Sequence, residues 1–363
     1  MKILIDIGHP AHVHYFRNFI KIMTDKNHEF FVTARDRSVI FKLLNYYNID
    51  FISRGSGSKT FVGKIVYAFY SLFIIFRSAL KFKPDIFISQ GGVYTSPIAK
   101  LLNKASISTE DTENAAISHK ISKLFGSYIL SPTCFEKKIS KKHLKYNSYQ
   151  ELFYLHPKYY APNSEIYNYL NLDKGEKFVI IRFVDWNAHH DIGHNGISLG
   201  NKLKVVKKLS EYAKVFILSE CELPNELIQF KINIPPERMH DALYYAELLY
   251  GESSTMASES ACVGTPAIFI DNEGRGYTTE EEHKYGLVFN FKETLDDQEK
   301  SIQKAVSLLE NINLKEEWHI SNKKMISDKI NPTEFLVWFI ENYPKSIKIM
   351  TENLDFQLKF SKT

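Results

Sequence analysis

The sequence predicts an α/β protein built from two consecutive Rossmann-like domains with parallel sheets. Short apolar runs that suit buried strands alternate with stretches of helical periodicity, which is typical of doubly wound sheets. The alternation occurs twice, over residues 1–155 and 177–330, and 363 residues are too many for one hydrophobic core. We expect turns and a linker at 156–176, and a helix followed by a lysine-rich, mobile tail at 331–363.

The composition excludes several classes of protein. Hydrophobic residues make up 44% of the chain and charged residues 24%, as in soluble globular proteins. A formal net charge of +4 is too small to indicate nucleic-acid binding, so we expect no nucleic-acid partner. The 3 cysteines are far apart without a Cys-x-x-Cys pair, which predicts neither a zinc site nor a disulfide framework. The N-terminus does not resemble a signal peptide, and a cytoplasmic location is therefore expected.

The first domain opens with a strand over 2–7 and a helix whose apolar positions fall at helical spacing between 13 and 23. RGSGSK at 54–59 predicts a flexible loop that suits phosphate but lacks Walker spacing. EDTEN at 110–114 predicts an acidic loop at the end of a strand. Further strands are expected at 28–36, 51–53, 84–92, 105–108 and 127–131, and further helices at 38–47, 95–102 and 116–125.

The stretch 61–82, FVGKIVYAFYSLFIIFRSALKF, is unusually apolar for a helix of this length. A transmembrane span needs roughly 20 apolar residues with few charges. Lys64, Arg77 and Lys81 interrupt the run at spacings that mark one side of a helix. Three interpretations stay open: a buried helix with one solvated edge, a helix lying on a membrane surface, and a true span.

The second domain is organised around residues 248–270, LLYGESSTMASESACVGTPAIFI. This stretch predicts a strand, a capped helix that ends at Gly264, and a second strand. A polar helix N-terminus at the carboxyl end of a parallel strand is suited to an anion, and Glu259 follows Thr255 by one helical turn. Other strands are expected at 178–184 and 214–218, helices at 200–212, 239–246 and 291–312, a polar loop at 185–198, and an extended segment at 231–236.

Three motifs resemble the GT-B glycosyltransferase superfamily, and in particular the bacterial lipid-linked N-acetylglucosaminyltransferases of peptidoglycan synthesis. They are GHPAHVHYF at 8–16, PDIFISQGGVYTSPIAKLLNKASISTEDTENA at 84–115 and GESSTMASESACVGTPAIFI at 251–270. The last motif is also similar to that of the non-hydrolysing UDP-N-acetylglucosamine 2-epimerases. The chain further resembles an uncharacterised domain-of-unknown-function family of this superfamily, which carries the Arg-x-x-x-x-x-Ala-His-His pattern of 182–190. The resemblance implies a GT-B fold, with two facing Rossmann-like domains and a cleft between them.

Two departures leave the reaction open. RFVDWNAHHDIG at 182–193 replaces the Gly-Gly-Ser phosphate loop of the transferases, and the residues after 271 lack their paired glutamines. The donor sugar and the choice between transfer and epimerisation therefore stay unassigned.

The catalytic candidates are histidines and one carboxylate. In a GT-B cleft the first loop faces the donor, so a neutral His12 could accept a proton from an acceptor hydroxyl, with His9 and His14 as alternatives. In an epimerase a carboxylate of the acidic loop could exchange the proton at the second carbon of the sugar. The candidates are His12, His189, His190 and Glu110, together with the loop glycines Gly8, Gly91, Gly92 and Gly251, which let backbone approach a ligand.

The donor candidates belong to the second domain. An arginine inside a buried strand needs an acidic or phosphate partner, which makes Arg182 a candidate for the pyrophosphate. The other candidates follow strands or begin helices: Ser219, Glu220, His240, Ser253, Ser254, Thr255 and Glu259. The resemblance implies that the last four hold the nucleotide. We expect no metal and no cofactor, because no Cys or carboxylate completes the histidine cluster at 9–14.

The sequence thus predicts a metal-independent glycosyltransferase that uses a nucleotide diphosphate sugar, expected to be UDP-linked, in bacterial surface polysaccharide or glycolipid synthesis. The first domain would hold a glycan or lipid-linked acceptor. Residues 61–82 would contact the inner face of the plasma membrane as a peripheral anchor. A nucleotide-sugar 2-epimerase and a non-catalytic nucleotide-sugar-binding protein are the alternatives.

Overall fold

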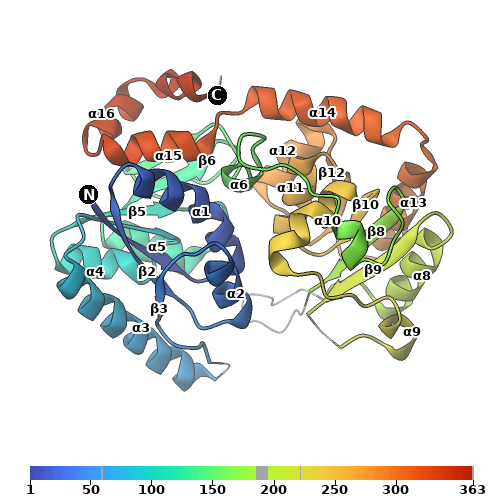
Figure 1. Ribbon diagram of the computed structural model, residues 1–363, viewed down its shortest axis with the longest axis horizontal. Helices are drawn as coiled ribbons and strands as arrows, with labels where there is room; N and C mark the ends of the chain where they lie inside the picture. The colour runs from blue at the N-terminus through green and yellow to red at the C-terminus, as the bar shows by residue number, and fades with distance from the viewer. Residues whose placement is uncertain (59, 185–194, 221, 362–363) are drawn as a thin grey trace. The chain divides into compact units, whose positions relative to one another are not determined.

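The computed structural model describes residues 1–58, 60–184, 195–220 and 222–361 (Figure 1). The chain divides into two compact units: unit 1 comprises Met1–Tyr154 and Lys329–Thr363, and unit 2 comprises Leu155–Asp328. Each unit consists of one parallel sheet with helices packed around it. The predicted α/β class with two Rossmann-like sheets is therefore confirmed.

The sheet of unit 1 has seven strands in the order β3-β2-β1-β4-β5-β6-β7, all paired in parallel. Its central strands are buried on both faces, which explains their continuous apolar runs. The strands are β1 Lys2–Ile7, β2 Glu29–Ala34, β3 Phe51–Ser53, β4 Ile86–Gln90, β5 Ala105–Thr109, β6 Tyr128–Pro132 and β7 His143–Tyr146.

The helices of unit 1 follow the predicted alternation of strand and helix. They are α1 Pro10–Asp25, α2 Ser38–Tyr46, α3 Phe61–Phe82, α4 Thr95–Leu101, α5 Ala116–Leu124, α15 Pro332–Glu341, α16 Lys345–Glu352 and the 3-10 helix η2 Leu354–Phe360, with α6 Leu152–Leu155 at the boundary between the units. The side chain of His9 accepts a hydrogen bond from the Ala11 amide, and Pro10 occupies the first helical position, so the sequence fixes where α1 begins.

Two parts of unit 1 differ from the sequence prediction. Sequence reasoning predicts no strand after 127–131 in this domain and so missed β7, a four-residue edge strand whose side chains alternate between half-buried and buried. The C-terminal segment, for which we expect a mobile tail, packs on α15: Trp338 contacts Phe356 at 4.7 Å between ring centroids, and Phe360 is buried. The side chain of Gln357 also accepts a hydrogen bond from the amide of Asn147 at 2.7 Å. The sequence prediction relied on the lysines of this segment and overlooked the aromatic residues that pack it onto α15.

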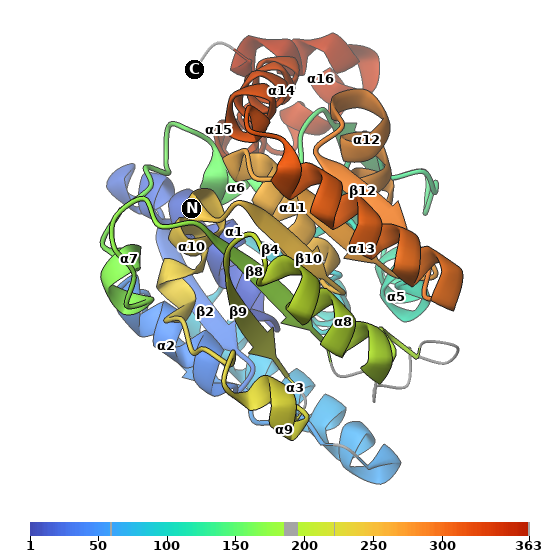
Figure 2. The same cartoon turned by 90° about the vertical axis from the view of Figure 1, so that its right-hand side faces the viewer.

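Helix α3 contradicts the interpretation as a buried helix. Only Ser71, Ile75, Ser78 and Ala79 are buried, and none of them precedes the middle of the helix. The N-terminal half extends beyond the other elements of unit 1 (Figure 2), and side chains such as Phe61, 72% exposed, face solvent. Among the described residues α3 is the one helix long and apolar enough to cross a membrane, yet it connects β3 to β4 and packs on the sheet.

The sheet of unit 2 has five parallel strands in the order β12-β11-β10-β8-β9. They are β8 Phe178–Phe183, β9 Lys214–Ser219, β10 Leu248–Gly251, β11 Ala267–Ile270 and β12 Val288–Phe291. Its helices are α7 Ile166–Tyr169, α8 Leu199–Leu209, α9 Asn225–Ile228, the 3-10 helix η1 Pro236–Arg238, α10 Met239–Tyr245, α11 Ser254–Val263, α12 Gly276–Tyr285, α13 Leu295–Glu310 and α14 Leu314–Asp328.

Sequence reasoning missed β12, α7 and α14 and began α13 too early. The side chain of Thr294 accepts a hydrogen bond from the Asp297 amide and starts α13 after β12, so the predicted helix 291–312 absorbed the end of a strand. Residues 156–176, expected to be a linker, lie within unit 2 and contain α7. Helix α14 is weakly amphipathic, and its buried side chains, Leu314, Trp318 and Met325, are too few to reveal its period.

Gly251 allows the backbones of β10 and β8 to lie close together. It pairs with Arg182 in the parallel register, and a Cβ atom at this position would stand 2.1 Å from the Arg182 carbonyl oxygen. The Arg182 backbone belongs to a paired strand, so it cannot shift to relieve this clash as a flexible side chain could. The glycine therefore allows the close approach that places the start of α11 next to the end of β8.

Replacing Gly251 by alanine is expected to lower the free energy of unfolding by about 3 kcal/mol, because β8 and β10 must separate to admit the methyl group. Gly200→Ala in α8 is the control. A Cβ atom at position 200 would meet no atom of the described residues within 4 Å beyond its own helix backbone. Alanine there should therefore be neutral or stabilising by up to about 1 kcal/mol. Urea unfolding of both variants measures the difference. Equal stabilities would contradict the inferred close approach.

Candidate functional site

The carboxyl ends of β1 and β4 in unit 1 meet at one small cavity of about 220 Å³. Ligands of open parallel sheets bind at this edge, so its polar side chains are candidates for function. The lining residues come from the ends of strands, the first loop and α3: Asp6, Gly8, His9, His12, Arg35, Arg54, Tyr67, Gln90, Val93 and Tyr94. The structure thus brings the predicted residues Gly8 and His12 together.

A buried ion pair between Asp6 and Arg54 forms the floor of this cavity. Arg54 Nε donates to Asp6 Oδ1 at 2.6 Å, and Thr33 Oγ1 donates to the same oxygen at 2.7 Å. Arg54 Nη1 donates to the hydroxyl of Tyr67 and, at 3.3 Å, to that of Ser71, both on α3. Burial lowers the pKa of Arg54, but Asp6, Tyr67 and Tyr94 together offset it and leave that pKa raised. Sequence reasoning missed this pair because Asp6 and Arg54 are 48 residues apart.

His12 is neutral in this environment. The Gly8 amide donates to His12 Nδ1 at 3.3 Å, which assigns the proton of the neutral ring to Nε2. Burial, and then the neighbouring His9 and Arg54, lower the pKa of His12 well below its ordinary value. In this tautomer Nε2 carries the proton and is a hydrogen-bond donor. To act as a base through Nε2, His12 would have to adopt the other tautomer. His9 caps α1, and His14 is buried beside Tyr47 and Tyr154, away from the cavity lining.

Glu110 lies at the end of β5 and is almost fully buried. Burial, and secondly the charge of Asp111, raise its pKa to about 7. Ser118 Oγ donates to Glu110 Oε2 at 2.7 Å, and the amides of Asp111 and Thr112 donate to Oε1. A carboxyl group that titrates near neutral pH can both give and take a proton.

Gly91 and Gly92 form the turn after β4, and both adopt left-handed backbone, with φ of +74° and +66°. A Cβ atom on Gly92 would stand 2.1 Å from Ser108 Oγ and 2.5 Å from Ser96 Oγ. Ser118 Oγ donates to the Gly91 carbonyl at 2.7 Å as well as to Glu110. The glycine pair therefore connects β4 to the Glu110 network.

In unit 2 the predicted helix N-terminus is present. Ser253 is the cap of α11, and its Oγ accepts a hydrogen bond from the Met256 amide at 3.3 Å. Ser253, Ser254 and Thr255 are partly exposed, whereas the rest of α11 is buried. The first amides of the helix and two hydroxyl groups thus meet solvent at the carboxyl end of β10, an arrangement that suits an anion.

Two predicted donor residues pair with each other one turn further along α11. His240 Nε2 and Glu259 Oε1 are 3.1 Å apart, and both side chains are buried. His240 lies on α10, which packs against α11, so the pair fixes the carboxyl group relative to the helix start. Sequence reasoning named both residues but did not foresee their contact, since they are 19 residues apart.

Arg182 and Glu220 form a second predicted pair. Arg182 Nη2 donates to Glu220 Oε1, and its Nε is buried without a hydrogen-bond partner among the described residues. Glu220 follows β9 immediately after Ser219, at the same sheet edge as the end of β8. The expected acidic partner of Arg182 is therefore Glu220, and one donor of the guanidinium group remains available. His189 and His190 lie outside the described residues.

Two carboxylates that sequence reasoning missed hold the ends of the polar loop after β8. Glu252 accepts hydrogen bonds from the amides of Val184 at 2.9 Å and Ile197 at 2.6 Å. Glu293 accepts from the amides of Asn195 and Gly196 at 2.6 and 2.8 Å. Glu252 lies inside the motif 251–270, so its position was visible in the sequence, but its backbone partners were not.

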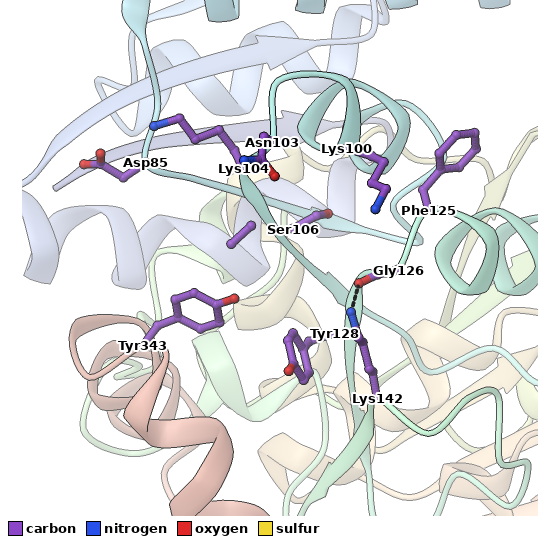
Figure 3. Close-up of a pocket in the computed structure, with 11 residues that line it drawn as sticks. Asp85, Lys100, Asn103, Lys104, Ser106, Phe125, Gly126, Tyr128, Lys142 and Tyr343 are labelled. Carbon is purple, nitrogen blue, oxygen red and sulfur yellow. Dashed lines mark hydrogen bonds between the residues drawn. The ribbon is translucent and has the colours of Figure 1, made fainter.

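Two larger cavities lie at the amino ends of strands, one in each unit. One in unit 1, of about 420 Å³, is lined by residues at the amino ends of strands, such as Ser106 and Tyr128, and by Tyr343 (Figure 3). Lys142 Nζ donates to the Gly126 carbonyl across it at 2.8 Å (Figure 3). One in unit 2, of about 630 Å³, includes Lys177 and Lys214 at strand starts. None of the predicted site residues lines either cavity.

The described part of the chain contains no group of three or more His, Cys, Asp or Glu side chains arranged to hold a metal ion.

Comparison with known proteins gives the family. Residues 1–274 match the family described as Protein of unknown function (DUF354). The chain belongs to this family. The DUF354 chain is also 24% identical over 283 residues to the uncharacterized protein MJ0665 of Methanocaldococcus jannaschii, covering 74% of this chain and 81% of that protein.

Three solved structures that are similar in fold to this DUF354 protein have a nucleotide or a nucleotide sugar bound. The UDP-GlcNAc 2-epimerase from Neisseria meningitidis bound to UDP-GlcNAc has a TM-score of 0.67 at 13% identity, covering 98% of this chain and 99% of that chain. The S. aureus MnaA–UDP complex has a TM-score of 0.63 at 13% identity, covering 99% and 97%. The spinosyn rhamnosyltransferase SpnG with thymidine diphosphate has 0.62 at 12%, covering 94% and 100%. These likenesses confirm the predicted GT-B fold.

Glu110→Gln is expected to make the stability of this protein less dependent on pH. The pKa of about 7 in the folded protein exceeds the ordinary 4.5, so the wild-type carboxyl group destabilises the fold as it loses its proton between about pH 5 and 8. The difference between the two pKa values corresponds to roughly 3 kcal/mol, which the glutamine variant should retain at pH 8. Urea unfolding across this range measures it. A difference in stability that is constant from pH 5 to 8 would contradict the raised pKa.

Proposed function

We propose that this protein is a metal-independent glycosyltransferase that uses a nucleotide diphosphate sugar, with UDP as the expected nucleotide. The observation that carries the proposal is the arrangement on α11. An open helix N-terminus at Ser253 to Thr255 is followed, one turn later, by the buried carboxylate of Glu259. The first feature suits a diphosphate and the second a ribose diol.

Arg182 would complete the donor site. Its strand pairs directly with β10, so the guanidinium group belongs to the same sheet edge as the start of α11. Transfer leaves negative charge on the departing nucleotide diphosphate, and an arginine can stabilise that charge without a metal ion. Glu220, which holds Arg182 Nη2, would orient the guanidinium group.

The fold neighbours support a nucleotide sugar as the substrate. Three of them contain bound UDP-GlcNAc, UDP and thymidine diphosphate, respectively. At 12% and 13% identity these neighbours supply only a fold, so we carry over the class of ligand and leave the sugar open.

Unit 1 would hold the acceptor. Its cavity contains His12, whose neutral ring could bind an acceptor hydroxyl or, in the other tautomer, accept its proton. A glycan carried by a lipid suits this unit, because the exposed apolar side chains of α3 would contact the membrane. We propose a role in surface polysaccharide or glycolipid synthesis at the inner face of the plasma membrane.

A second candidate function rests on Glu110. A buried carboxyl group with a pKa of about 7, at the carboxyl edge of the sheet, is equipped to remove and return a proton at a sugar carbon. The same scaffold would then act as a nucleotide-sugar 2-epimerase and would need no acceptor.

Glu259→Gln is expected to weaken UDP binding by about tenfold or more, because a neutral amide replaces a charged acceptor for the ribose hydroxyls. The glutamine can still accept a hydrogen bond from His240, which should preserve the fold. Glu247→Gln is the matched control, since Glu247 is also buried and paired, with Lys315 at 2.8 Å, but precedes β10 at the other sheet edge. Isothermal titration with UDP decides the matter, and unchanged binding by the Glu259 variant would remove the donor-site hypothesis.

Incubation with a panel of UDP-sugars in D2O, without an acceptor, separates the two reactions. A transferase should release free UDP slowly by hydrolysis and incorporate no deuterium into the sugar. An epimerase should yield a new epimer labelled at the second carbon, and Glu110→Gln should lower that rate by about a hundredfold or more. Binding of UDP-sugars with neither product would favour the non-catalytic alternative.

A further inference from the structure

The unit 1 cavity contains two guanidinium groups, Arg35 and Arg54, whose donors are not all used by the described part of the chain. Arg54 bonds to Asp6, Tyr67 and Ser71 through Nε and Nη1, while its Nη2 lies against Gly8. Arg35 has no hydrogen bond or ion pair to the described residues, and its Nε is buried. Because Asp6 is the one carboxylate among the described residues that line the cavity, two positive groups face one negative group.

Arg35 is held in place by its surroundings without being neutralised. Its guanidinium carbon lies 5.8 Å from the ring centroid of Tyr67. A Cβ atom on Gly57 would stand 2.0 Å from Arg35 Nη2, so the loop after β3 packs its backbone directly against the guanidinium group. Burial, and then the charge of Arg37, lower the pKa of Arg35, which is the direction expected of a cation that lacks an anion.

A third donor adjoins the two arginines. The ring of His12 lies against Gly8 beside Arg54, and its Nδ1 is occupied by the Gly8 amide, which leaves Nε2–H as a donor. Forked guanidinium donors combined with a neutral N–H donor match the tetrahedral oxygens of a phosphate group. A neutral sugar alone would leave the positive charge of the cavity unbalanced.

Helix α3 connects this cavity to an apolar surface. On one side, Tyr67 and Ser71 hold Arg54. On the other, Phe69 and Phe73 are 71% and 56% exposed. No acidic residue occurs between 61 and 82, and the cations Lys64, Arg77 and Lys81 are exposed on the same helix. This combination of apolar and basic side chains is complementary to a membrane surface that carries anionic lipids.

We propose that the unit 1 cavity binds the phosphate group of a membrane lipid, with Arg35 and Arg54 as its ligands and the exposed face of α3 resting in the lipid. The inference rests on the proposed function, since it names the chemical class of the acceptor as a lipid phosphate. A lipid held by its phosphate would place the adjoining sugar or hydroxyl beside His12.

Vesicle co-sedimentation of the full chain tests the proposal. Vesicles of phosphatidylcholine alone, with added phosphatidic acid, and with added phosphatidylserine at the same surface charge are compared. Wild type should prefer phosphatidic acid, whose phosphate is terminal. Arg35→Ala should abolish that preference and weaken binding by about tenfold. Gly57→Ala should have a similar effect, because its methyl group displaces Arg35 and the glycine backbone is not left-handed.

Arg37→Ala is the matched control, because it removes an equal charge two residues away, outside the cavity. It should weaken binding to both anionic vesicles equally and only a few-fold. Equal effects of Arg35→Ala and Arg37→Ala, or no preference for phosphatidic acid, would overturn the phosphate site.

Free inorganic phosphate distinguishes a lipid from a soluble ligand. Phe69→Ser combined with Phe73→Ser should lose vesicle binding and keep the Arg35-dependent affinity for free phosphate measured by titration calorimetry. Vesicle binding that survives this double substitution would overturn the role of α3. UDP binding is measured on the same proteins and should survive Arg35→Ala. If wild type does not bind UDP, the donor site is refuted. The vesicle experiment still tests the phosphate site independently.

Discussion

The buried ion pair between Asp6 and Arg54 is the contact on which unit 1 depends most. Removing two charges from water is costly, and such a pair is tolerated only when further hydrogen bonds satisfy both partners. Thr33 supplies one to the carboxylate, and Tyr67 and Ser71 supply acceptors to the guanidinium group. Because these partners come from β2 and α3, the pair connects the first strand, its neighbour, the loop after β3 and the apolar helix.

In unit 2, carboxylates that accept hydrogen bonds from backbone amides connect separate segments, as the ion pair does in unit 1. Glu252 connects the end of β8 to Ile197, and Glu293 holds Asn195 and Gly196. Such contacts require no second charged side chain. Arg182 pairs with Glu220 at the sheet edge, and its Nε has no hydrogen-bond partner among the described residues. The two units therefore position their candidate site residues by different means on the same kind of sheet.

Local patterns in the sequence predicted most strands and helices because buried parallel strands and capped helices depend on neighbouring residues. Ser253, Thr255 and Glu259 were predictable for this reason: cap and carboxylate lie within one helix. Contacts between distant segments were not predictable. The pairs Asp6–Arg54, Arg182–Glu220 and His240–Glu259 depend on strand order, which no single-sequence period specifies. Strands β7 and β12 were missed because each is only partly buried, so neither shows the continuous apolar burial of the equally short β10 and β11.

Helix α3 has two sides with different surroundings: one packs against the core of unit 1, and the other is exposed to solvent. Its apolar content alone left burial, membrane contact and spanning open, and the structure decides only against burial. The buried residues are Ser71, Ser78 and Ala79 together with Ile75, so three of the four are small and α3 contributes little apolar area to the core. The large side chains are left on the outside, where soluble proteins rarely gather them without a partner. An exposed face of this kind beside a cavity rich in arginine is best explained by a ligand that is itself both apolar and anionic.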